Sequence, residues 1–122
     1  MKKTITIIML AAAMIATAES ETLAPLKCRA SECRGQVMVN MPKPILREKL
    51  IISGFTLVDA NEYSLSFISP DGVEIELIFL DAGGGRTIVT LDTSGNGFTT
   101  SRLREVAAAW AQYLLAFGSV PR

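Results

Sequence analysis

Apolar and polar residues alternate through most of the middle of the chain. The segment 73–81 reads VEIELIFLD, in which apolar side chains alternate with Glu74 and Glu76. A two-residue period is typical of a β-strand with one buried face and one wet face. The same period predicts strands in QVMVNM (36–41), in FTLVDANEYSLSFIS (55–69, with a bend near 59–61) and in RTIVTLD (86–92). The turns SPDG (69–72) and AGGG (82–85) join the later strands, which are therefore expected to be antiparallel.

Two segments follow a helical period instead. Pro42 and Pro44 suit the start of a helix and Gly54 suits the position after its end, so we predict a helix over 43–53. A second helix is predicted from a cap at Thr100 or Ser101 to Gly118. Its core-facing stripe consists of Leu103, Val106, Ala107, Trp110, Leu114 and Phe117.

The order of these elements predicts an α+β fold. We expect a small antiparallel sheet of about four strands with both helices packed on one face, in the order β-α-β-β-β-α. Residues 19–35 show no clear period and are predicted to be an irregular N-terminal segment, followed by a single domain over 36–122.

The first eighteen residues have the three parts of a secretory signal peptide. Lys2 and Lys3 form a positive n-region, the segment 5–15 is apolar, and Ala16-Thr17-Ala18 is a small-x-small cleavage site. The apolar run is shorter than the roughly 20 residues that span a bilayer, so no membrane anchor is expected after cleavage. The short Lys-Lys n-region is typical of bacterial export. The sequence therefore predicts a periplasmic or secreted bacterial protein.

The cysteines fit that compartment. Cys28 and Cys33 are the only two in the chain, and a pair in an exported protein is expected to form a disulfide. A loop this short adds only about 2 kcal/mol of stability, so the bond would staple the N-terminal segment alone. The spacing differs from the Cys-x-x-Cys of redox enzymes.

The chain contains no histidine, which removes the commonest general base and most zinc sites. With no catalytic constellation and no cofactor motif visible, the sequence predicts a protein that is not an enzyme and needs no cofactor.

One loop resembles the start of a calcium-binding loop. Asp92, Ser94 and Asn96 occupy loop positions 1, 3 and 5 of an EF-hand pattern, and Gly97 occupies position 6. Position 12, which needs a bidentate Glu, holds Leu103. The same residue types also suit a plain turn between a strand and a helix, which is the interpretation we favour. No metal site is therefore predicted.

Charge is unevenly distributed along a chain whose formal net charge is zero. Basic residues concentrate between positions 27 and 49, and acidic residues between 59 and 92. The two regions either face each other in the fold or lie in solvent, or they form a bipolar surface that docks a partner or a second copy. Nothing in this balance indicates nucleic acid binding, and a homodimer is left open.

We therefore expect an exported domain that binds another cell-envelope macromolecule, as an accessory, inhibitor or immunity-type protein. The candidate partner-binding residues are Glu74 and Glu76 on the wet strand face and Arg29 and Arg34 near the cysteines. The alternative is a binder of a small hydrophobic ligand held between sheet and helices. A third hypothesis, a carboxylate-based hydrolase, needs two close carboxylates with one raised pKa. It fails if Asp92, Glu74 and Glu76 prove exposed and far apart.

Overall fold

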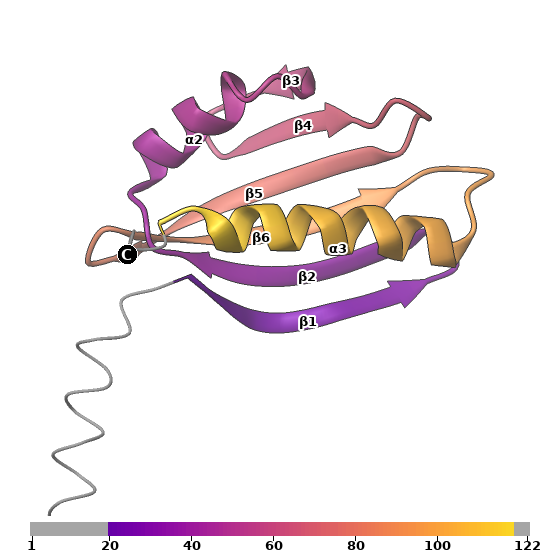
Figure 1. The fold of residues 1–122 in the computed structure, drawn as a ribbon, viewed down its shortest axis with the longest axis horizontal. Coiled ribbons are helices and arrows are strands. Elements are labelled where there is room, and N and C mark those ends of the chain that lie inside the picture. Colours follow the sequence, from indigo (N-terminus) through magenta and orange to yellow (C-terminus); the bar gives the residue numbers. More distant parts are fainter. Residues whose placement is uncertain (1–19, 119–122) are drawn as a thin grey trace, which may run out of the picture.

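The computed structural model describes residues 20–118, which form one six-stranded antiparallel sheet and two helices (Figure 1). This confirms the predicted α+β class. The predicted signal peptide, 1–18, lies outside the described residues. In chain order the elements are β1 (Glu21–Arg29), β2 (Glu32–Val39), α2 (Lys43–Ile51), β3 (Thr56–Ala60), β4 (Ser64–Ile68), β5 (Glu74–Gly83), β6 (Arg86–Ser94) and α3 (Thr100–Ala116).

The prediction of about four strands is wrong at two places: the N-terminal segment forms an additional strand, and 55–69, predicted as a strand with a bend, forms two paired strands, β3 and β4. The segment predicted to be irregular, 19–35, contributes all of β1 and the first residues of β2. β1 is an edge strand that contains Pro25 and departs twice from regular pairing with β2. Its side chains are mostly exposed or half-buried, so the strand lacks the strict apolar alternation of a strand with one buried face.

The strands follow the order β1-β2-β6-β5-β4-β3 across the sheet. Four of these strands, β3 to β6, form a meander in which each strand pairs with the next. The β1–β2 hairpin instead docks beside β6, the last strand of the chain. This long-range pairing places residues near position 34 next to residues near position 92.

Both helices contribute to a single core on one face of the sheet. α3 packs over β1, β2 and β6, while α2 contacts β5 (Figure 1). Leu46 and Leu50 of α2 are fully buried in the same cluster as the predicted stripe of α3, of which only Phe117 is partly exposed. The sheet contributes alternate residues to this core, among them Val37, Val39, Leu65, Phe67, Ile75, Leu77, Val89 and Leu91.

The helix ends follow the usual chemistry with one correction. Thr99, and not Thr100 or Ser101, caps α3, because its side-chain oxygen accepts a hydrogen bond from the Arg102 backbone N–H. Gly118 follows the helix with a φ of 74°, as predicted for a residue after a helix end.

The opposite face of the sheet is covered by neither helix. Its side chains are those that alternate with the core residues, and no other helix or strand in the described part of the chain packs on them. Between residues 20 and 118, no helix is both long enough and apolar enough to cross a membrane.

Candidate binding face

Charged residues of three neighbouring strands meet on the uncovered sheet face. Across the sheet, Arg34 of β2 lies opposite Asp92 of β6, and Asp92 lies opposite Glu76 of β5. One step along the strands, Glu32 and Glu74 flank Ser94 in the same way. Because side chains two residues apart on a strand point to the same face, both rows lie on one surface.

An ion pair lies at the centre of this surface. Arg34 donates from Nε and Nη2 to Oδ2 of Asp92, at 3.2 and 2.8 Å. Asp92 is only 7% exposed, whereas Arg34 is an exposed residue. A buried carboxylate is costly unless it is paired and hydrogen-bonded, so Arg34 compensates the burial of Asp92. The pair is therefore held in place by contacts within the chain itself.

Glu32 lies beside this pair. Its carboxylate is 3.8 Å from Nη2 of Arg34. A hydrogen bond with Asp92 and the negative charge of Asp92 raise the pKa of Glu32 above its ordinary value, although Arg34 and Arg29 act in the opposite direction. Glu32 therefore keeps its proton to a higher pH than a glutamate in solution.

This geometry bears on the hydrolase hypothesis. Asp92 is buried, Glu76 is its cross-strand neighbour, and Glu32 lies close enough for Asp92 to raise its pKa. The hydrolase hypothesis is therefore not excluded, because Asp92, Glu74 and Glu76 are not all exposed and far apart. The nearest group to Asp92, however, is the Arg34 guanidinium, which already compensates its charge.

Two hollows adjoin on the uncovered face, with volumes of about 680 and 480 Å³. Glu32 and Arg34 line both of them. The larger hollow carries a basic excess and the smaller an acidic excess. The larger is lined by Ala24, Pro25, Lys27, Arg29, Gly35, Gln36, Ile78 and Thr90 besides the shared pair, and the smaller has Glu74, Glu76 and Asp92 among its lining residues.

All four residues singled out from the sequence as partner-binding candidates line these hollows. Arg29 and Arg34 belong to the larger, and Glu74, Glu76 and again Arg34 to the smaller. The sequence pattern alone predicts two separate surfaces for them. Docking of the β1–β2 hairpin against β6 brings them to a single face.

Sequence reasoning missed Glu32 and the central role of Asp92. The alternation in RTIVTLD puts Asp92 on the opposite face from Val89 and Leu91, so its position on the wet face was readable. Glu32 was not recognised as a residue of this face because its segment, 19–35, was predicted to be irregular.

The residues of the calcium hypothesis do not form a closed loop around one point. Asp92 lies within β6 and is bonded to Arg34, Ser94 is the last residue of β6, and Asn96 lies in the turn beyond it. Leu103, at the twelfth loop position, is fully buried in the core. Within residues 20–118, no group of three or more His, Cys, Asp or Glu side chains is placed to hold a metal ion.

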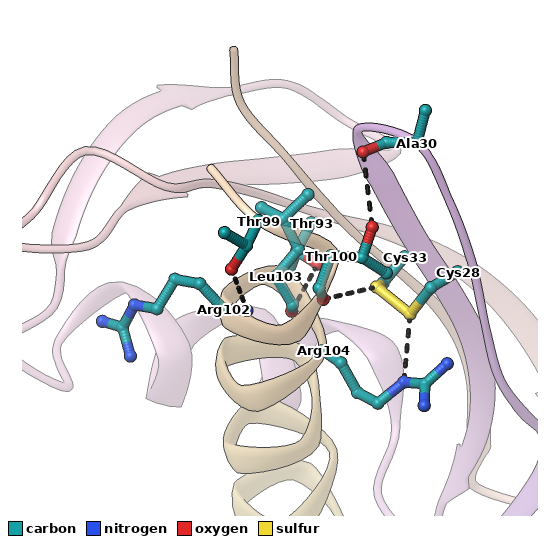
Figure 2. The surroundings of a disulfide bond; sticks show 9 residues. All are labelled: Cys28, Ala30, Cys33, Thr93, Thr99, Thr100, Arg102, Leu103 and Arg104. Atoms are coloured by element: carbon teal, nitrogen blue, oxygen red, sulfur yellow. Dashed lines mark hydrogen bonds between the residues drawn. A yellow bond between two sulfur atoms is a disulfide. The ribbon is translucent and has the colours of Figure 1, made fainter. Parts of the chain in front are cut away.

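The predicted disulfide between Cys28 and Cys33 is present (Figure 2). The two residues are opposite each other in the β1–β2 hairpin, with Cα atoms 4.0 Å apart. Arg104 of α3 donates from Nε to Sγ of Cys28 at 3.4 Å, and the Thr100 hydroxyl donates to the Ala30 carbonyl at 3.5 Å. The bond and these contacts fix the end of the hairpin that carries Lys27 and Arg29.

A smaller hollow of about 220 Å³ lies between the β1–β2 hairpin and α3. Its lining is largely apolar and includes Leu26, Val37, Leu91, Ala108, Ala111 and Leu115. Pockets that hold drug-sized ligands usually measure about 300–1,000 Å³, so this space suits only a small apolar group.

No protein-family model, curated protein or solved structure matches this chain.

Proposed function

We propose that this chain is an exported, non-enzymatic domain that binds another protein of the cell envelope through the uncovered face of its sheet. The observation that carries the proposal is the pair of adjoining charged hollows on a sheet face that nothing within residues 20–118 covers. An antiparallel sheet often leaves one face to solvent. Here that face is hollowed beside an ion pair whose aspartate, Asp92, is buried.

The charges of the face define what a partner must present. Lys27, Arg29 and Arg34 favour acidic groups over the β1–β2 side, and Glu74 and Glu76 favour basic groups over the β5 side. Such complementarity sets the orientation of a complex and speeds its formation more than it adds raw affinity. Because the Arg34–Asp92 pair is already formed, these side chains at the centre of the face lose little conformational entropy on binding.

Export supports a partner in the envelope. The chain begins with the features of a bacterial signal peptide, and disulfides such as Cys28–Cys33 persist in oxidising compartments. A periplasmic or secreted location fits both observations. An accessory subunit, an inhibitor and an immunity-type protein would all use such a surface.

Site-specific photo-cross-linking in exporting cells tests this proposal. A photoreactive residue replaces Glu76 on the uncovered face or, as the matched control, Glu105 on the outer side of α3; both glutamates are exposed. We expect a reproducible cross-linked protein from position 76 and none of that mass from position 105. Equal cross-linking from both positions, or none from position 76, would contradict the proposal.

The 220 Å³ hollow favours a second candidate, the binding of a small hydrophobic ligand between sheet and helix. Native mass spectrometry of the purified protein separates the two candidates. A bound mass that Ala108→Leu removes, by filling the hollow, would favour the ligand. A spectrum of the bare chain would leave only the protein-binding proposal.

A further inference from the structure

The exposed large apolar side chains concentrate in one stretch of the chain, which includes β3. Nine such side chains are exposed in the described part of the chain, and six of them fall between positions 45 and 63. Ile52 and Val58 are 74% and 62% exposed. A cluster of this kind on a monomer usually marks an interaction site. We call it the β3 edge patch; it consists of Ile45, Ile51, Ile52, Phe55, Val58 and Tyr63.

The patch surrounds an edge strand that is open to further pairing. β3 pairs with β4 on one side and has no neighbouring strand on the other. The opposite edge strand, β1, contains Pro25, two register irregularities and the disulfide, and it contacts α3. These features block strand addition, whereas β3 has neither a proline nor a basic residue and only one bulge, at Val58.

The charges around β3 point to a second copy of this chain. Asp59 and Glu62 lie at the C-terminal end of β3. Lys49 lies in the last turn of α2, the helix that precedes the N-terminal end of β3. Lys49 shares one exposed face of α2 with Ile45 and Ile52, since the three follow a helical spacing of four and three residues. Among residues 20–118, Lys49, Asp59 and Glu62 form no ion pair.

We propose that two copies pair antiparallel through β3 across a two-fold axis. Antiparallel pairing places the N-terminal end of one β3 beside the C-terminal end of the other. Lys49 of each copy then approaches the acidic end of the other copy's strand, twice by symmetry. The pairing buries Val58 of each copy, the exposed apolar residue at the middle of β3.

The register with the axis at Val58 places the one bulge of β3 at the centre of the pairing. Val58 then faces its own equivalent, and Leu57 faces the other copy's Asp59, so no like charges are opposed. An axis at Asp59 would oppose two carboxylates.

A two-fold axis perpendicular to the sheet also keeps both uncovered faces on the same side. This last consequence rests on the proposed function, because a dimer would then present two binding faces and gain from bivalency.

Sedimentation equilibrium over about three decades of concentration tests the dimer by mass action. The protein is expressed from its full sequence in an exporting host and purified as it accumulates. We expect a concentration-dependent monomer–dimer equilibrium that Val58→Lys abolishes. Leu80→Lys is the matched control, because Leu80 is equally exposed, at 62%, but lies on β5 outside the patch. Circular dichroism and thermal unfolding establish that each variant is folded.

A charge exchange tests the arrangement. Lys49→Glu and Asp59→Lys should each raise the dimer dissociation constant about fivefold, and the double variant should recover part of that loss. A wild-type protein that stays monomeric throughout would overturn the proposal, as would a dimer unaffected by Val58→Lys or a double variant weaker than both single ones. Since no partner is present in this measurement, its failure is separate from failure of the proposed function.

Discussion

At the scale of single residues, an ion pair outside the uncovered sheet face joins Asp71 to Arg102. Arg102 donates to both carboxylate oxygens, at 2.9 and 3.1 Å, and the Ser69 hydroxyl donates as well. The hydrogen bonds from Arg102 and then from Ser69 lower the pKa of Asp71 to about 2. The contact ties the β4–β5 turn to the first turn of α3.

This contact predicts a pH dependence. Because the pKa of Asp71 is lower in the folded protein than in the unfolded chain, its contribution to stability is complete above the unfolded value of 3.8 and is lost as the pH falls through about 2. Asp71→Asn should flatten the acid limb of the stability curve, measured by urea unfolding between these values. Asp81→Asn is the control and should leave the acid limb unchanged, because Asp81 is an exposed aspartate that forms no ion pair within residues 20–118. Equal slopes for both variants would contradict the assignment.

A second residue-scale prediction concerns Gly118. Its φ is +74°, and a Cβ there would lie 2.3 Å from the backbone oxygen of Asn40. Gly118→Ala should therefore lower the free energy of unfolding by about 2 kcal/mol or more. Gly84→Ala has a similar φ of +64° but open space around it, and should cost about 1 kcal/mol. Thermal unfolding separates the two; equal losses would mean that the contact with Asn40 contributes nothing.

Residue-scale properties were predictable where they depend on local pattern. The stripe of α3 was readable because helical spacing alone selects its buried residues. The burial of Asp92 beside Arg34 was not, because its cause is a partner 58 positions away in the chain.

At the scale of elements, the β1–β2 hairpin depends on its disulfide. The bond closes a short loop, so a Cys28→Ser, Cys33→Ser double variant should lose about 2 kcal/mol. The loss should be local, because β1 is an edge strand with irregular pairing. Hydrogen exchange should accelerate across residues 21–29 and remain unchanged in β4 and β5. Uniform acceleration would show that the bond supports the whole fold.

Elements with a strong period were predicted and those without one were missed. β5 and β6 alternate between buried and more exposed residues over 74–79 and 86–91, because one of their faces is buried. β1 is held by pairing, by a disulfide and by α3, none of which leaves a local alternation. The cap of α3 was predicted one or two residues too late, because Thr99 has the extended backbone of a cap while Thr100 and Ser101 are already helical.

At the scale of the whole molecule, the decisive event is the pairing of β2 with β6. It joins the basic N-terminal region to the acidic middle of the chain and makes one bipolar face from two charge clusters. The sequence indicated the clusters but not their adjacency, because strand order depends on long-range pairing that local periodicity does not encode.

The most direct test of the account is the dissociation constant for the protein cross-linked at position 76. Glu76→Lys reverses a charge at the centre of the uncovered face, and Glu105→Lys makes the same change on α3. The account predicts that the first variant weakens binding at least about tenfold while the second leaves it unchanged. Equal affinities for the wild type and Glu76→Lys would contradict the claim that this face binds the partner.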